Sequence, residues 1–364
     1  MSKPPFHADQ VGSLLRPAEL REARAAARRG EIAAERLREV EDRCIREAVA
    51  RQEAVGLAGI TDGEFRRDWW HIDFLKGFEG VEAVADPGTP AFHGADEAVP
   101  VLTVTGKLRR SRPVMADAFA FLRSVTTRTP KLTIPAPSML HLRGGRPAIS
   151  REAYPSLDPF WADAARAYRE EIRDLAAAGC TYLQLDDVSF AYLCDASIRQ
   201  GYRARGDDPE LAPRVYADTI NAVLRDRPKG LTVTIHTCRG NFKSTWMASG
   251  GYEPVAQVVF GGLEVDGYFL EYDTERAGGF EPLRFVPRGR KIVLGLVTTK
   301  SPELESKDTL KRRIEEAAKY VPLEDLCVSP QCGFSSTHHG NKLTEADQWR
   351  KLERIVEVAR EVWG

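Results

Sequence analysis

The chain has 364 residues, more than most single domains, although closed α/β barrels reach this length undivided. Lysine plus arginine number 52 against 53 aspartate plus glutamate, a balance that gives no reason to expect nucleic acid or an anionic membrane as a partner. With 43% hydrophobic residues the chain can build a large core, and we expect one catalytic domain over residues 1–364. A division into two domains stays open.

No segment of the sequence is typical of a targeting signal. Residues 1–6 lack an apolar core segment, and no later stretch has the length of a membrane span. The six cysteines are too dispersed for a disulfide framework, so metal binding or burial is expected of them. We therefore expect a cytoplasmic protein; its oligomeric state does not follow from the sequence.

The first part of the chain carries two helical patterns and a short strand. The first helix is expected over residues 18–29 and the second over 33–55, where apolar residues recur every three or four positions. Gly56 ends the second helix. Residues 57–60 then form a short strand that delivers Glu64 to its far end.

The pattern changes between about residues 66 and 129. This stretch contains Pro- and Gly-rich segments, an alternating run over 99–107 and a helical run over 114–125. We interpret it as an insertion after the second strand that carries a hairpin and a helix. It is a candidate lid.

Strands and helices alternate regularly from residue 131 to the end of the chain. Further helices are expected over 159–179, 211–224 and 307–320, and a last one starts near Thr344, whose side chain can cap it together with Asp347. Eight strands alternating with helices are the pattern of an α/β fold of the (β/α)8 TIM-barrel type. The predicted strands lie near 8–12, 57–60, 131–134, 181–185, 231–235, 267–271, 291–295 and 325–329.

Polar residues follow nearly every predicted strand. Because TIM-barrel enzymes place their active sites at the carboxyl ends of the strands, this distribution supports both the fold and a site at that face. The residues concerned are Ser13, Asp62, Glu64, Ser138, Asp186, Asp187, His236, Cys238, Glu271, residues 298–300 and Cys332.

Two of these residues, His236 and Cys238, indicate a metal site. They follow an alternating β-branched run, and residues two apart on an extended chain point to the same side. Glu271 and Cys332 stand at or just after the ends of two later strands. One histidine, two cysteines and one glutamate suit a borderline-soft ion such as zinc, and Glu271 would be the weaker ligand that a substrate could displace.

Each candidate also has a structural interpretation. A single histidine in a strand is more often a hydrogen-bonded core residue than a ligand, and Glu271 is equally compatible with a partnered acid at the barrel mouth. Asp186 and Asp187 could cap the helix after their strand. Arg66 and Arg67 could hold a carboxylate or lie in solvent, whereas the other four cysteines, including Cys327 inside a strand, are expected to be core residues.

Together these segments resemble the cobalamin-independent methionine synthase family, specifically its C-terminal catalytic barrel. The resemblance covers nearly the whole chain, and its most specific part is the His-x-Cys, Glu and Cys set in this order. The matching segments are Val11-Gly12-Ser13 with the following Arg16-Pro17, residues 60–64, Leu183-Gln184-Leu185-Asp186, Ile235-His236-Thr237-Cys238, Leu270-Glu271 and residues 329–333.

The resemblance implies roles for individual residues. His236, Cys238, Glu271 and Cys332 would bind a catalytic zinc ion. Val11, Gly12 and Ser13 would lie beside the carboxylate of homocysteine, and Glu64 and Asp186 beside its ammonium group. The implied reaction is methyl transfer to the homocysteine thiol to give methionine, in which zinc makes the thiol a nucleophile at neutral pH.

The sequence departs from the family where the methyl donor would bind. The Asp-x-His-Ser-Pro run that supplies an acid for the departing folate is replaced by Thr298-Thr299-Lys300-Ser301-Pro302, so Lys300 is the candidate acid. The tryptophan of the folate pocket has no counterpart in residues 134–141. The donor is therefore either 5-methyltetrahydrofolate or a methylcorrinoid, in the second case with a corrinoid protein as a candidate partner.

Two alternatives to this function stay open. The first keeps the zinc chemistry but alkylates another thiol, such as coenzyme M. Glu64 and Asp186 favour an amino-acid thiol, because both anions need a cation. The second, from another class, is a non-catalytic barrel that binds a metal or an amino acid without turnover.

Overall fold

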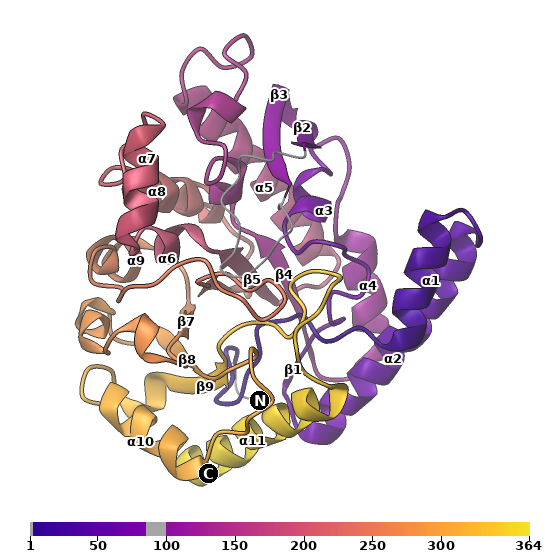
Figure 1. The fold of residues 1–364 in the computed structure, drawn as a ribbon, viewed down its shortest axis with the longest axis vertical. Coiled ribbons are helices and arrows are strands. Elements are labelled where there is room, and N and C mark those ends of the chain that lie inside the picture. The colour runs from indigo at the N-terminus through magenta and orange to yellow at the C-terminus, as the bar shows by residue number, and fades with distance from the viewer. Residues whose placement is uncertain (1–2, 85–99) are drawn as a thin grey trace.

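The computed structural model describes residues 3–84 and 100–364. Seven parallel strands form one curled sheet in the order β1-β4-β5-β6-β7-β8-β9, so that neighbours in the chain are neighbours in the sheet (Figure 1). The strands are β1 Gly59–Ile60, β4 Thr129–Pro135, β5 Tyr182–Asp187, β6 Thr232–Thr237, β7 Gly267–Glu271, β8 Lys291–Val297 and β9 Leu326–Pro330. The expected TIM-barrel fold is confirmed, and the predicted strands after residue 57 are found within a few residues.

The prediction of a first strand near residues 8–12 is wrong. The segment lies at the expected place between β9 and β1, but only Ala8 pairs with the sheet, in a single parallel bridge to Val328. The next carbonyl groups accept hydrogen bonds from side chains instead of from a neighbouring strand. These bonds run from Lys131 Nζ to Gln10 O, from Gln184 Nε2 to Val11 O at 2.7 Å and from Thr61 Oγ1 to Gly12 O at 2.7 Å.

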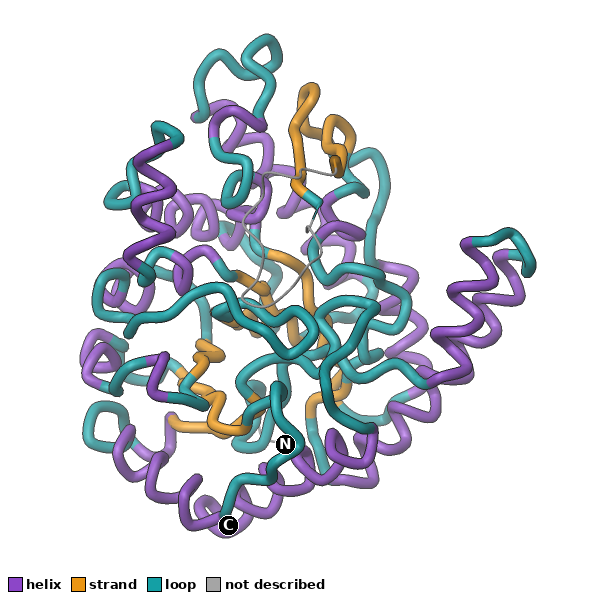
Figure 2. Tube along the Cα trace, in the orientation of Figure 1, coloured by secondary structure: helices purple, strands orange, loops and turns teal. Residues whose placement is uncertain are grey.

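Helices cover the outside of the sheet (Figures 1 and 2). Helix α5 shows why: its buried residues, among them Phe160, Tyr168 and Leu175, form one apolar face. The α-helices outside the predicted insertion are α1 Ala18–Arg28, α2 Ala34–Val55, α5 Asp158–Ala177, α6 Ser189–Tyr192, α7 Ala196–Ala204, α8 Ala212–Leu224, α9 Ala256–Gly262, α10 Lys307–Ala317 and α11 Glu345–Trp363. Short 3-10 helices lie at Pro137–Leu140, Arg146–Ala148, Glu275–Ala277, Glu281–Phe285 and Leu323–Asp325.

The two ends of the helical layer differ in how they meet the barrel. Helix α11 packs along it and begins with the predicted capping box, in which Thr344 and Asp347 exchange hydrogen bonds with each other's backbone N–H groups. Helix α1 and the start of α2 project away from the barrel (Figure 1). Within the described residues, no helix combines the length and the apolar character that a membrane span requires.

The segment predicted as an insertion contains a short helix, α3 (Ile72–Leu75), a strand pair and helix α4 (Ala116–Val125). The pair consists of β2 (Glu79–Val84) and β3 (Val101–Arg109), which are antiparallel as in a hairpin. The part of the insertion at 85–99 lies outside the described residues. Whether the insertion acts as a lid stays a prediction.

The inside of the barrel combines an apolar cluster with a buried ion pair. Lys131 Nζ lies 3.1 Å from Asp9 Oδ1, both side chains are fully buried, and Tyr182 OH donates to Asp9 Oδ2 at 2.8 Å. Such a pair is tolerated inside a protein because hydrogen bonds satisfy its remaining polar atoms. The apolar cluster consists of Val11, Phe269, Val293 and Cys327, which confirms the core position of Cys327.

Candidate active site

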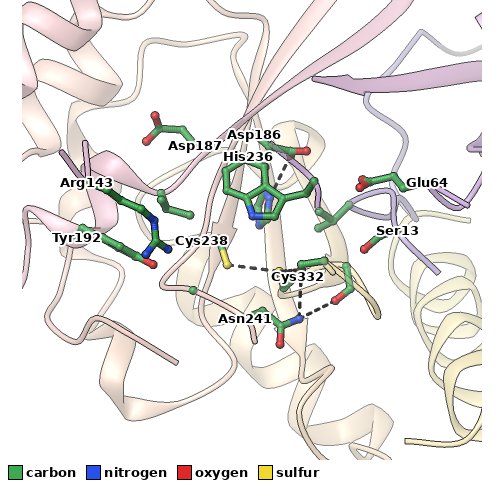
Figure 3. Close-up of a pocket in the computed structure, with 16 residues that line it drawn as sticks. Ser13, Glu64, Arg143, Asp186, Asp187, Tyr192, His236, Cys238, Asn241 and Cys332 are labelled. Atoms are coloured by element: carbon green, nitrogen blue, oxygen red, sulfur yellow. Dashed lines mark hydrogen bonds and ion pairs between the residues drawn. The ribbon is translucent and has the colours of Figure 1, made fainter. Parts of the chain in front are cut away.

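A pocket opens at the carboxyl ends of the strands (Figure 3). Glu64 and Ser13 lie on one side of it and Arg143 and Tyr192 on the other, with the cysteines between them. Of the residues singled out in the sequence, those that line it are Val11, Ser13, Glu64, Asp186, Asp187, His236, Cys238 and Cys332.

Two cysteines and a histidine meet in this pocket. The Sγ atoms of Cys238 and Cys332 are 3.3 Å apart, and one ligand atom from each of His236, Cys238 and Cys332 lies within 4.8 Å of the others. All three side chains are buried, and both cysteines are free thiols. The hydrogen bond from Cys238 lowers the pKa of Cys332 to about 6, and the same bond raises the pKa of Cys238 well above its usual value. The pair therefore readily carries one negative charge.

The fold brings these residues together in two ways. His236 lies in β6, and Cys238 follows it on the same side of the extended chain, as the alternation predicted. Cys332 comes from the loop after β9 and is 94 residues away in sequence. It reaches Cys238 because the carboxyl ends of all barrel strands point to one face.

The His236 imidazole is fixed on both of its nitrogen atoms. Nδ1 lies 3.3 Å from Asp186 Oδ1, and Nε2 lies 3.2 Å from the carbonyl oxygen of Gln331. Burial lowers the pKa of His236, but the hydrogen bond to Asp186 and the charge of Cys332 outweigh it and leave the pKa raised. A carboxylate on one imidazole nitrogen is the usual support for a histidine that binds a metal through the other, and a metal ion on Nε2 would replace its contact with the Gln331 carbonyl.

Glu271 lies beside this group rather than within it. Its Oε2 is 4.0 Å from Cys238 Sγ and accepts a hydrogen bond from Arg239 N at 3.1 Å, while Oε1 pairs with Arg276 at 2.7 Å. Burial would raise the pKa of Glu271, yet the charges of Lys300 and Arg239 lower it below its usual value. The side chain is thus an ionised, partnered carboxylate within reach of the thiols.

Glu64 stands on the opposite wall in a strained backbone conformation. Its φ is 59°, in the left-handed region that a non-glycine residue occupies at an energetic cost. Thr133 Oγ1 donates to Glu64 Oε1 at 3.0 Å, and Arg67 Nη1 lies 3.6 Å from Oε2. Burial raises the pKa of Glu64 to about 7, although Arg67 opposes the shift. Arg67 therefore supports a carboxylate, whereas Arg66 pairs with Glu41 and Asp42 away from the pocket.

Gly333 allows the loop after β9 to lie against the N-terminal segment. A Cβ atom at this position would overlap with Ser13 Oγ, and Ser13 O accepts a hydrogen bond from Phe334 N at 2.9 Å. The glycine thus permits close contact with Ser13, a reason that the sequence did not show. It lies next to Cys332, so an added side chain would displace either Ser13 or the thiol.

We expect Gly333→Ala to reduce the affinity for both metal and amino acid by at least about tenfold, and to lower the free energy of unfolding by about 1–3 kcal/mol, as overpacking does. Titration calorimetry and urea unfolding measure these effects. Gly201→Ala in α7 is the control, because no heavy atom lies within 4 Å of its added Cβ. Equal affinities in Gly333→Ala and wild type would contradict the tight packing at Ser13.

Lys300 lines a neighbouring cavity with Asp273 and Thr298, not the pocket of the two cysteines. Its Nζ is buried and makes no hydrogen bond to a described residue. Burial lowers the pKa of Lys300, but the charges of Glu271 and Asp273 outweigh it and leave the pKa raised. Lys300 therefore carries its proton at neutral pH.

Several residues that line the pocket or contact its lining carried no recognisable signal in the sequence. Thr133 contacts Glu64 from inside a strand, and Asn241 Nδ2 donates to Gly333 O at 2.9 Å. Gln331 contacts His236 through its backbone carbonyl, which any residue could supply. Trp70 also lines the pocket.

The fold and the site define a class: TIM-barrel proteins with a thiol-rich candidate metal site at the carboxyl ends of the strands. The chain belongs to the family described as "Cobalamin-independent synthase, Catalytic domain", whose family model matches residues 6–361. This match confirms the resemblance inferred from the sequence.

Some relatives match over nearly their whole length, and others are longer enzymes. The uncharacterized protein YxjH of Bacillus subtilis is 48% identical, and the alignment covers 99% of this chain and 96% of that one. A structure from Listeria monocytogenes, described as a putative vitamin-B12 independent methionine synthase, has a TM-score of 0.81 and 39% identity, with 100% of both chains covered. The 5-methyltetrahydropteroyltriglutamate–homocysteine methyltransferase of Vibrio harveyi is 22% identical over 97% of this chain but only 42% of its own length.

Proposed function

We propose that this protein is a zinc-dependent S-methyltransferase that transfers a methyl group to the thiol of homocysteine and forms methionine. The observation that carries the proposal is the buried group of His236, Cys238 and Cys332, with donor atoms within 4.8 Å of one another. Family membership supports methyl transfer to homocysteine. Six free cysteines fit a reducing compartment, so we place the reaction in the cytoplasm.

The donor atoms in the pocket fit zinc. Two thiols and an imidazole are ligands that this ion prefers, and the negative charge shared by Cys238 and Cys332 attracts a cation. Glu271 is the proposed fourth ligand, which the substrate sulfur would replace. When bound, zinc would supply Lewis acidity that keeps a coordinated thiol deprotonated near neutral pH.

The remaining residues would bind and orient the substrate. Glu64 and Asp186 would hold the ammonium group, and the segment of Val11, Gly12 and Ser13 would bind the carboxylate. These contacts leave the sulfur little freedom before methyl transfer, which lowers the entropic part of the barrier. Lys300 is the proposed acid for the leaving group, because it holds a proton and would donate it from the neighbouring cavity.

The test combines elemental analysis with a methylation assay. We expect about one zinc per chain and methionine formation from L-homocysteine with at least one of three donors: 5-methyltetrahydrofolate with one glutamate, the same folate with three, or methylcobalamin. Coenzyme M is the competing acceptor. Faster methylation of coenzyme M would overturn the choice of thiol, and tight metal binding without turnover with any donor would favour the non-catalytic barrel.

A further inference from the structure

Gln184 lies inside the barrel and joins the two sides of the pocket that face an amino acid. Its side chain is fully buried, and Nε2 donates to Val11 O at 2.7 Å and to Asp186 Oδ1 at 2.6 Å. One amide nitrogen thus connects the N-terminal segment to the acid at the end of β5. No part of the methyl-transfer chemistry proposed above uses this residue.

The N-terminal segment depends on such contacts because it is not a strand. Beyond its single bridge at Ala8, the carbonyl groups of Gln10, Val11 and Gly12 are held by side chains that come from other parts of the barrel. The Val11 carbonyl has Gln184 as its donor. The position of Val11 and Ser13 in the pocket is therefore set partly by the length and direction of the Gln184 side chain.

Asp186 depends on the same amide. Its Oδ1 accepts from Gln184 and also lies 3.3 Å from His236 Nδ1, so two groups fix the rotation of the carboxylate. The NH2 group of an amide has two N–H donors, so it can donate to a carbonyl and a carboxylate at once without adding a charge. A glutamate here would face two acceptors, and an apolar side chain would leave both acceptors without this donor.

The carbonyl oxygen of the Gln184 amide does not make comparable hydrogen bonds in the described part of the chain. Gln184 Oε1 is buried and accepts no hydrogen bond from a described residue. A buried carbonyl without a partner costs stability. The hydrogen bonds of this side chain are thus those of its N–H donors, which hold residues of the pocket.

We propose that Gln184 is a positioning residue that sets the spacing between the N-terminal segment and Asp186, and so preorganises the site for the amino-acid head group of the thiol. The inference rests on the proposed function, because that function places an amino acid between these two elements. Binding energy would otherwise be spent on ordering the segment and the carboxylate.

The test compares the zinc-loaded full-length protein with Gln184→Met, which keeps the side-chain length but has no donor. Titration calorimetry measures Kd for L-homocysteine and for 2-mercaptoethanol, a thiol without the head group. We expect Gln184→Met to bind homocysteine at least about tenfold more weakly, and 2-mercaptoethanol within about twofold of wild type. A residue with a purely structural role would shift both constants together.

The matched control is Thr234→Val. Thr234 is the register partner of Gln184 on β6, is fully buried and makes no hydrogen bond to Val11 or Asp186. It should leave both constants unchanged. Should Gln184→Met fail to fold, Gln184→Asn, whose amide is too short to reach both acceptors, replaces it.

Three outcomes overturn the inference. Homocysteine affinity equal to that of wild type means that Gln184 positions nothing, and an equal loss for both thiols means that its role is structural. Wild-type protein that binds 2-mercaptoethanol but not homocysteine removes the proposed function itself. That last result is seen before any variant is measured, so the two failures are distinguishable.

Discussion

Replacing Cys238 by serine is expected to leave the protein with less than about a tenth of the zinc that the wild type holds after dialysis against a weak chelator. A serine hydroxyl stays protonated at neutral pH and is a poor ligand for a borderline-soft ion. Loss of a residue that only supports a metal ligand costs 10–100-fold in affinity, so loss of a ligand should cost at least about 100-fold. Elemental analysis and competition with a chromogenic chelator measure both quantities.

The control for this substitution is Cys180→Ser. Cys180 is also buried but precedes β5, at the opposite end of the strand from the pocket, and its thiol donates a hydrogen bond to the backbone oxygen of Tyr182 at 3.5 Å. It should retain full zinc content. Zinc binding by Cys238→Ser with wild-type affinity would show that the pair of Cys238 and Cys332 is not a metal centre, and the proposed reaction would lose its means of activating the thiol.

The fold was predictable wherever it follows from local periodicity. Strand β7 has the predicted bounds, and helices α1 and α2 begin and end within a residue of the predicted positions. The N-terminal segment was not predictable, because Gln184 is 173 residues away from the Val11 carbonyl that it holds. An alternating pattern cannot tell a carbonyl bonded to a strand from one bonded to a distant side chain.

The residues of the site likewise divide into those that could be predicted from the sequence and those that could not. His236 and Cys238 share one extended stretch, so their convergence is a local property, and Cys332 joins them through the barrel arrangement. What the sequence could not give is the direction of long side chains. Arg67 turns inward to Glu64 while Arg66 turns outward to Glu41, and Lys300 lies in the neighbouring cavity with Asp273.

Replacing Glu64 by glutamine is expected to stabilise the protein at pH 8 while it weakens amino-acid binding. Burial raises the pKa of Glu64 from 4.5 to about 7. Below pH 4.5 the carboxyl group is protonated in both folded and unfolded chains, so its ionisation costs no stability there. As the pH rises from 4.5 to about 7, the unfolded chain loses its proton first, and the folded state is progressively disfavoured.

This cost is fully present above pH 7. It amounts to about 3 kcal/mol, which is the free-energy equivalent of the difference between the folded and unfolded pKa values. Glutamine has no proton to lose, so the variant does not carry this cost. Urea unfolding should therefore show similar free energies for wild type and Glu64→Gln at pH 4.5, and a gain of about 3 kcal/mol for the variant at pH 8. Glu22→Gln on the exposed face of α1 should show no gain at either pH.

The affinity for an amino acid should fall in Glu64→Gln, although the stability of this variant rises. An ammonium group needs the Glu64 carboxylate, so wild-type affinity should fall about tenfold for each pH unit below 7, because binding must then release a proton. L-Methionine is the suitable probe, because its thioether has no proton to lose. The measured pH dependence then does not include the ionisation of a substrate thiol. Glu64→Gln should bind it at least about tenfold more weakly at pH 8, without this pH dependence. A variant that gains stability but keeps full affinity would mean that Glu64 is buried for a reason unrelated to the substrate, and the ammonium site would have to rest on Asp186 alone.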